Sequence, residues 1–240
     1  YISAALCLYL LLTTKGTHRI VLSKIRIHES YLVEILKYGL PSGFQNSIIG
    51  LANVVVQSNI NSFGDMAMAG CGAYSKVEGF AFLPITSFTM ALTTFVGQNL
   101  GARKYERALQ GARFGMICSM TLAEIIGVIT FVFCPQFIAA FDSTPAVIQY
   151  GSLRGQTSAF FFFLLAYSHC ISAILRGAGK SMVPMIVMLV CWCFVRVAGL
   201  TITGILIHNI WCVYWIYPIT WSLSSITFFI YYHKVDWLHS

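Results

Sequence analysis

Five charged side chains lie inside long apolar stretches of this 240-residue sequence, where a charge is costly unless it is paired or hydrated. They are Lys76, Glu78, Glu124, Arg154 and Arg196. A helical rise of about 1.5 Å per residue places all five between the middle of the expected membrane segments and their outer ends. Charged groups that share one depth in a membrane segment predict either a polar cavity or ion pairs between helices.

Two arrangements explain these buried charges. In one, a polar cavity opens to the outside, and Glu78 and Glu124 are paired against the three basic residues. In the other, the charges form structural ion pairs between helices. Their shared depth favours the cavity, because charges that serve only packing need not lie at one level. Arg154 fits the cavity less well than the others, since its long side chain can extend outward to the membrane surface.

The first long apolar segment adds a polar face. Small or polar residues recur there at intervals of three or four, which is the spacing of one helix face: Ser42, Asn46, Gly50, Asn53, Gln57 and Asn61. Such a face contacts either a neighbouring helix or a water-filled path, and the sequence leaves both open. The candidate residues of the substrate or cation cavity are therefore Asn46, Asn53, Gln57, Lys76, Glu78, Glu124 and Arg196.

The sequence does not predict an enzyme or a metal site. It lacks the HExxH and GxSxG patterns of hydrolases, and its loops contain no acidic motif suited to a metal. The eight cysteines are scattered in apolar runs and are expected to be small buried hydrophobic residues. His169 stands alone within its segment and is expected to form a hydrogen bond between helices.

Composition identifies the solvent in which these residues act. The chain is 58% hydrophobic and 10% charged, whereas soluble domains contain about 25% charged residues. So few charges cannot cover a water-facing surface, which argues against a soluble enzyme and a nucleic-acid-binding protein. The expected partner is the lipid bilayer, and the expected fold class is an all-α polytopic membrane protein.

Apolar periodicity divides the chain into four parts. Residues 1–12 are expected to be the end of a truncated membrane helix, 13–37 a basic linker with a short interfacial helix near 30–37, 38–233 a bundle of six spans, and 234–240 a tail. The expected spans are Tyr38–Ser62, Met68–Leu100, Ala108–Cys134, Ile148–Leu175, Val183–Ile207 and Val213–Tyr232. Pro135 is expected between two spans, and Pro84 is expected to kink the second span.

The basic residues predict the orientation. Twelve of the fifteen Lys and Arg residues lie in the linker, in two of the loops and at the chain end, all on one side of the expected bundle. The loops on the opposite side contain Asp65 and Asp142 and no Lys or Arg. Short loops rich in Lys and Arg stay in the cytoplasm. The linker and the carboxy terminus are therefore predicted to be cytoplasmic.

Several motifs resemble the carboxy-terminal half of the multidrug and toxic compound extrusion (MATE) family, especially its bacterial members. Gly39-Leu40-Pro41 opens the first span, and Asn61-Ser62-Phe63-Gly64 ends it. Val96-Gly97-Gln98-Asn99-Leu100-Gly101-Ala102-Arg103 ends the second span and is followed by Tyr105-Glu106-Arg107-Ala108. The segment from Leu175 to Pro184 joins the fourth and fifth spans. The match extends from about Ile35 to the end, with the motifs in the expected order.

The resemblance implies a twelve-helix transporter, of which this chain is the second six-helix lobe. Such proteins export small organic cations by alternating access, driven by entry of Na+ or H+, and they require no other cofactor. An amino-terminal lobe outside this sequence is the implied partner, so the 240 residues alone are not expected to transport. A bacterial cytoplasmic (inner) membrane is the implied location.

One departure from the family pattern concerns the coupling acid. Many members carry a glutamate in the first helix of this lobe, where this sequence has Gln45, Asn46, Asn53 and Gln57. Glu78 and Glu124 are then the remaining candidates within this lobe. The alternative function is a flippase for lipid-linked oligosaccharides or polysaccharides of the same superfamily, whose cavity would be more cationic.

Overall fold

The computed structural model describes residues 1–16, 19–22 and 25–238, and these are helical with short connections and no β-strand. The elements in chain order are α1 (Ile2–Thr13), α2 (Glu29–Asn61), α3 (Asp65–Gly101), α4 (Tyr105–Ala139), α5 (Pro145–Ala159), α6 (Phe162–Gly177), α7 (Met182–Met188), the π-helix η2 (Leu189–Val195), α8 (Arg196–Leu206) and α9 (Ile210–Lys234). The chain forms two compact units, Tyr1–Gly39 and Leu40–Ser240.

The first unit contains α1, the basic linker and the beginning of α2. The short interfacial helix expected near residues 30–37 is not separate, because α2 begins at Glu29 and continues without a break to Asn61. Pro41 lies within this helix. Neighbouring groups in a membrane protein can satisfy the carbonyl that a proline leaves unbonded. Lys24, counted among the basic linker residues, lies outside the described residues.

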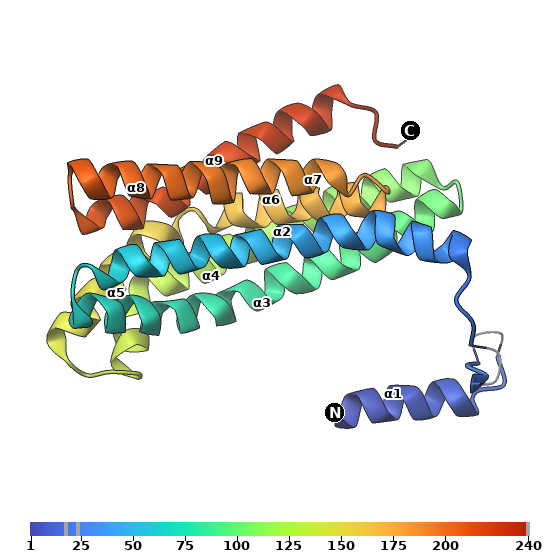
Figure 1. The fold of residues 1–240 in the computed structure, drawn as a ribbon, viewed down its shortest axis with the longest axis horizontal. Coiled ribbons are helices and arrows are strands. Elements are labelled where there is room, and N and C mark those ends of the chain that lie inside the picture. The colour runs from blue at the N-terminus through green and yellow to red at the C-terminus, as the bar shows by residue number, and fades with distance from the viewer. Residues whose placement is uncertain (17–18, 23–24, 239–240) are drawn as a thin grey trace. The chain divides into compact units, whose positions relative to one another are not determined.

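The second unit is a bundle whose helices run lengthwise beside one another (Figure 1). Each of the six expected segments is helical, and η2 together with α7 and α8 makes up the fifth. Within the part of the chain that the structure describes, four helices are long and apolar enough to cross a membrane: α3, α4, the helix from Met182 to Leu206, and α9. The bent pair of α5 and α6 makes a fifth. Although α2 has 33 residues, its Asn and Gln residues keep its hydropathy below that of a typical span.

Two expectations about helix breaks were wrong. Pro135 lies inside α4, which continues to Ala139, instead of between spans. The fourth span, expected to be continuous from Ile148 to Leu175, is broken between α5 and α6 with a bend of 59°. No Gly or Pro marks this break, since the local sequence is Ala159-Phe160-Phe161-Phe162. Both halves pack on α3, α4 and α9, and α6 also contacts α7, so the bend is a feature of the packed bundle that the local sequence does not mark.

Glycines bring the helix backbones close together. A Cβ at Gly70 of α3 would lie 2.8 Å from the backbone nitrogen of Gly151 in α5, and a Cβ at Gly177 of α6 would lie 2.6 Å from the carbonyl oxygen of Thr93 in α3. Small residues at such positions let membrane helices pack by backbone contact. A third contact of this kind involves Gly97, where an added Cβ would lie 3.3 Å from the carbonyl oxygen of Gly177. These contacts fix how α3, α5 and α6 are rotated relative to one another.

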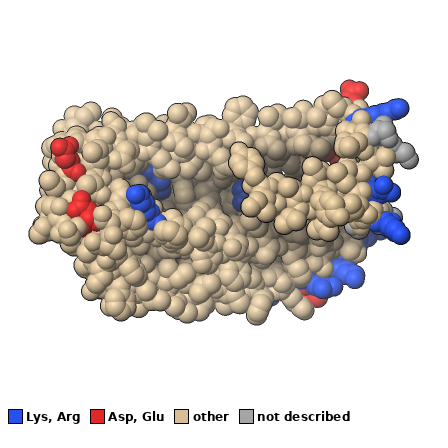
Figure 2. Space-filling model, turned by 90° about the horizontal axis from the view of Figure 1, so that it is seen from below, with Lys and Arg blue, Asp and Glu red and all other residues tan. Residues whose placement is uncertain are grey.

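The two ends of the second unit differ in charge. At one end, the Lys180 ammonium donates a hydrogen bond to the Asp236 carbonyl oxygen, at 3.1 Å, so the loop after α6 meets the segment after α9. This end carries most of the basic residues of the unit. At the other end, the Phe63 and His208 rings stack 4.8 Å apart, which joins the loops after α2 and α8. Figure 2 shows a surface that is mostly uncharged between its ends.

Candidate functional site

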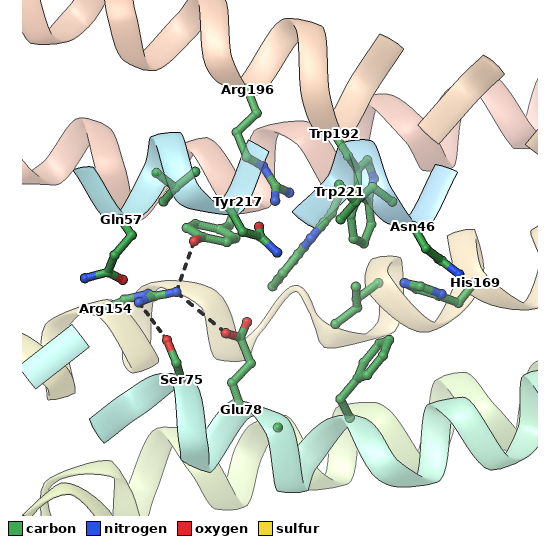
Figure 3. A pocket seen from close by; sticks show the side chains of 16 residues that line it. Asn46, Gln57, Ser75, Glu78, Arg154, His169, Trp192, Arg196, Tyr217 and Trp221 are labelled. Carbon is green, nitrogen blue, oxygen red and sulfur yellow. Dashed lines mark hydrogen bonds and ion pairs between the residues drawn. The ribbon is translucent and has the colours of Figure 1, made fainter. Parts of the chain in front are cut away.

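A cavity of about 480 Å³ lies among α2, α3, α5, α6, η2, α8 and α9 in the second unit. Its volume is within the range of small-molecule sites in proteins, about 300–1,000 Å³. Polar, charged and aromatic side chains line it (Figure 3), and the lining residues include Asn46, Asn53, Gln57, Ser75, Glu78, Phe82, Arg154, His169, Trp192, Arg196, Tyr217 and Trp221. Most of these residues lie far apart in the sequence.

Arg154 of α5 is held at one side of the cavity by hydrogen bonds to two other helices, α3 and α9. Its guanidinium donates hydrogen bonds to the Cys71 carbonyl oxygen at 3.0 Å, to Ser75 Oγ at 3.2 Å and to the Tyr217 hydroxyl at 3.1 Å. The residue is 4% exposed. The position on α5 is set by the close contact between Gly70 and Gly151, one turn before Arg154. Arg154 therefore joins α3, α5 and α9 around the cavity.

Glu78 forms an ion pair with Arg154 across the cavity. One carboxylate oxygen of Glu78 lies 3.7 Å from an Arg154 guanidinium nitrogen, and the Glu78 side chain is 21% exposed. It points toward Arg154 from α3, one turn after Ser75 (Figure 3). An exposed fraction of this size leaves the carboxylate accessible from the cavity, so it can bind a proton or a cation without breaking the bundle apart.

Arg196 lies at the opposite side of Tyr217, at the start of α8 (Figure 3). It is 2% exposed and donates a hydrogen bond to Thr220 Oγ1 at 2.8 Å. Its guanidinium carbon lies 5.1 Å from the Trp192 ring centroid and 4.6 Å from the Tyr217 ring centroid. The guanidinium carbon of Arg154 lies 4.9 Å from the same Tyr217 ring. One aromatic ring thus contacts both cations.

Trp192 reaches the cavity from a π-helix. The wider turns of η2 are rare and often occur at functional sites. Trp192 donates its indole N–H to Ser224 Oγ at 3.1 Å, and Ser224 Oγ lies 2.9 Å from Ser168 Oγ. Because the indole nitrogen is used in this network, the ring presents its apolar surface to the cavity.

His169 also lines the cavity, and here the expectation was wrong. Its Nε2 is buried without a hydrogen-bond partner among the described residues. The imidazole ring instead packs edge-on against Phe82 and Trp192, at centroid distances of 4.9 and 5.3 Å. A hydrogen bond between helices, as expected from its solitary position, is therefore not formed at that nitrogen.

The structure brings together five of the seven candidate residues. Asn46, Asn53 and Gln57 line the cavity from α2, and Glu78 and Arg196 line it from α3 and α8. The polar face of α2 thus lies on an open cavity, which was one of the two expected arrangements. Gln57 Nε2 also donates a hydrogen bond to Asn61 Oδ1, at 2.9 Å on the same face.

The structure places the other two candidates elsewhere. Glu124 lines a separate pocket on α4 with apolar neighbours such as Ile125 and Val128. Lys76 is exposed, and its ammonium lies 5.4 Å from the Phe141 ring centroid. The expected pairing of both acids with three basic residues in one cavity was therefore wrong, because Lys76 and Glu124 lie on helix faces that point away from it.

Sequence reasoning left several lining residues out of its candidate set, among them Arg154, Trp192, Tyr217 and Trp221. Arg154 was set apart because an arginine near a helix end can extend outward, yet its hydrogen bonds hold it inside. Arg154 lies three residues after Gly151, one helix turn away on the small-residue side of α5, and this signal could have identified it. The aromatic residues carried no signal, since aromatic residues are frequent throughout the chain.

Among the described residues, no group of three or more His, Cys, Asp and Glu side chains is arranged to hold a metal ion. The side chains that line the cavity are suited to binding a small molecule. The cavity offers two guanidinium groups, one carboxylate, three amide side chains and several aromatic faces within an apolar bundle. Such a set suits a small molecule with a flat ring and polar substituents.

Comparison with known proteins gives consistent matches. The MatE family model matches residues 41–201. A probable multidrug resistance protein NorM of Thermotoga maritima is 30% identical over 64% of this chain and 33% of its own length. A probable multidrug resistance protein YoeA of Bacillus subtilis is 22% identical over 88% of this chain and 46% of its own length. The chain thus spans a third to a half of the curated relatives it matches.

A solved structure described as the outward-facing conformation of a multidrug resistance MATE family transporter of the MOP superfamily matches the whole chain. The TM-score is 0.89, the sequence identity is 18%, and 54% of that structure is covered. This match concerns the fold, which agrees with the helical bundle described above. The shared part again amounts to about half of the larger protein.

Proposed function

Because this chain belongs to the MATE family of membrane transporters, we propose that it forms one lobe of a secondary active exporter of small organic compounds. Export proceeds by alternating access and is driven by entry of Na+ or H+. Names of the matched relatives as multidrug resistance proteins support this proposal. We place the protein in a bacterial cytoplasmic membrane, with its carboxy terminus in the cytoplasm.

The observation that carries this proposal is the Glu78–Arg154 pair inside an open cavity. An ionisable pair within a membrane helix bundle is expensive, and such pairs commonly mark pathways for ions or substrates. A pair needed only for packing would be enclosed by the bundle, whereas Glu78 keeps 21% of its side chain accessible.

In the proposed mechanism, the incoming ion loads Glu78. A proton or Na+ on the carboxylate removes the attraction between Glu78 and Arg154 and leaves Arg154 with its bonds to Cys71, Ser75 and Tyr217. The remaining bonds connect α5 to α3 and α9, but the attraction between Glu78 of α3 and Arg154 of α5 is lost. Loading therefore changes how tightly the three helices are held together. Alternating access involves two conformations of the transporter, and an ion that binds one of them more strongly shifts their populations. This shift couples ion entry to the movement of substrate.

The resemblance in sequence implies organic cations as substrates. Among the described lining residues, the carboxylate that would attract a cation is Glu78, and it is already paired with Arg154. The charge of the substrate is therefore a separate question from transport itself.

Glu78→Gln tests the proposal directly in the complete transporter. This change keeps the size of the side chain and removes its charge, so an applied Na+ or H+ gradient is expected to lose most of its effect on dye efflux. Efflux from everted vesicles is measured with ethidium, a cationic dye, and with fluorescein, an anionic dye, so that the result does not depend on substrate charge.

Glu124→Gln is the matched control, because it makes the same change on α4 outside the cavity. It is expected to keep at least half of the gradient-driven efflux. Full gradient dependence in the Glu78→Gln variant would refute Glu78 as the coupling group. Absence of gradient-driven efflux of both dyes in the unmodified protein would refute the transport proposal as a whole.

A further inference from the structure

The charges that line the cavity are unbalanced. Two guanidinium groups, Arg154 and Arg196, face one carboxylate, Glu78. Within the described residues, Glu78 forms its ion pair with Arg154, and Arg196 forms none. The cavity therefore carries an excess of positive charge, which is expensive in a low-dielectric bundle unless a bound anion compensates for it.

Arg196 has unused capacity for hydrogen bonding. A guanidinium carries five N–H donors, and the hydrogen bond described for Arg196 goes to Thr220. Its Nε is buried and has no hydrogen-bond partner among the described residues. The rings of Trp192 and Tyr217 stabilise its charge in part, but they do not accept bonds from its edge as a carboxylate would. The side chain is thus buried, incompletely bonded and directed into the cavity.

The remaining walls select for a flat molecule. Phe82, Trp192, Tyr217 and Trp221 contribute aromatic surface around the two arginines. Trp192 is fixed by its hydrogen bond to Ser224, so its ring is already oriented before a ligand arrives. From α2, the side-chain amides of Asn46, Asn53 and Gln57 can donate to acceptors at the rim of a planar ring.

We infer that this cavity binds a planar aromatic anion, with a carboxylate or phosphate group on Arg196 and the ring against Trp192 and Tyr217. Guanidinium groups match the two oxygens of such anions in a bidentate geometry. The inference rests on the proposed transport function, since it names the substrate class of the same cavity. It replaces the organic cation implied by the sequence resemblance.

A cation in this cavity would meet unfavourable electrostatics. Its positive charge would lie near two guanidinium groups, while the carboxylate that could offset them is already paired with Arg154. Repulsion between like charges is strong where water is largely excluded. An anion at Arg196 reverses this balance without disturbing the Glu78–Arg154 pair.

Two dyes with the same ring system but opposite charge separate these alternatives. Fluorescein and rhodamine 6G share a planar xanthene, and fluorescein is anionic whereas rhodamine 6G is cationic. Binding is measured by fluorescence anisotropy with the complete transporter in nanodiscs. Fluorescein is expected to bind more tightly, and Arg196→Gln is expected to weaken its binding by about tenfold or more, because the change removes charge-assisted hydrogen bonds to the anion.

Two further variants make the result independent of general damage to the fold. Arg196→Lys keeps the charge and is expected to restore part of the fluorescein affinity, although it loses the bidentate geometry. Lys76→Gln removes one positive charge from the same helix as Glu78, outside the cavity, and is expected to leave fluorescein binding unchanged.

Tighter binding of rhodamine 6G, or unchanged fluorescein binding in the Arg196→Gln variant, would overturn the inference. So would a failure of both dyes to bind. Arg196-dependent fluorescein binding without gradient-driven efflux would support the anion site and refute the transport proposal. Gradient-driven efflux of rhodamine 6G without efflux of fluorescein would support the transport proposal and refute the anion site. The failures of the two proposals are therefore distinguishable.

Discussion

At the scale of single residues, the site depends on Tyr217. Its ring contacts both guanidinium groups, and its hydroxyl accepts a hydrogen bond from Arg154 at 3.1 Å. Two cations near one another repel, and the ring face between them reduces that cost. The hydroxyl also fixes the end of Arg154 that pairs with Glu78. One side chain therefore organises both halves of the charged site.

Tyr217→Phe tests the hydroxyl while keeping the ring. The change removes an acceptor from a buried charged donor, so we expect a loss of about 1.5 kcal/mol or more in the free energy of unfolding. Tyr214→Phe is the control, because the Tyr214 hydroxyl joins the same two helices through an uncharged hydrogen bond to the Tyr150 carbonyl oxygen. Its expected loss is about 0.6 kcal/mol. Unfolding in detergent measures both, and equal losses would contradict the importance of the charged bond.

At the scale of helices, backbone contacts at glycine decide which residues face the cavity. The contact between Gly70 and Gly151 sets the position of α5 on α3, and therefore the position of Arg154 near Ser75. The break after Ala159 then lets α6 take a different direction, bent by 59° from α5. Leu165 and His169 reach the cavity from this second half.

Gly70→Ala tests the helix contact. The added Cβ would lie 2.8 Å from the Gly151 nitrogen, closer than a real Cβ contact, so the two backbones must separate. We expect a loss of about 1–3 kcal/mol in the free energy of unfolding. Because Arg154 moves with α5, weaker fluorescein binding is expected as well.

Gly72→Ala is the matched control for this change, two residues further along α3. A Cβ there meets no atom within 4 Å. Alanine favours a helix over glycine by about 1 kcal/mol, so unchanged or increased stability is expected. A loss at position 72 as large as the loss at position 70 would show that helix propensity, and not backbone contact, controls this region.

At the scale of the whole second unit, charge separates the two ends of the bundle. The end formed by the loops after α3 and α6 and the segment after α9 contains Arg103, Lys104, Lys180 and Lys234. At the other end, the Thr144 backbone N–H donates to Asp142 Oδ1 at 2.8 Å and holds the pKa of Asp142 below its usual value. Asp142 is therefore ionised at neutral pH, so the two ends of the bundle differ in charge at that pH.

This difference predicts a carboxy terminus in the cytoplasm, by the preference of basic loops for that side. Green fluorescent protein fused after the last residue is expected to fluoresce, and alkaline phosphatase inserted in the loop after α8 is expected to be active outside the cytoplasm. The reverse pattern of the two reporters would contradict the orientation. Replacing the basic residues of the loop between α3 and α4 by Gln is expected to lower the fraction of chains in this orientation.

The sequence by itself determined the helical class, the bilayer environment and the family. These properties depend on hydropathy and motifs within single segments, so they can be predicted without knowing how the segments pack. The sequence also selected Glu78, Arg196 and the amide face of α2, because polar groups in an apolar run are visible without knowing their neighbours.

The tertiary structure decided which of those charges share a space. Arg154 entered the cavity, and Lys76 and Glu124 were excluded from it, because helix rotation is set by contacts between distant residues such as Gly70 with Gly151 and Gly97 with Gly177. The bend after Ala159 and the inclusion of Pro135 in α4 are likewise seen only in the folded bundle, since the local pattern of Gly and Pro predicted neither. A residue's depth in its segment is local information, whereas the direction of its side chain depends on the whole bundle.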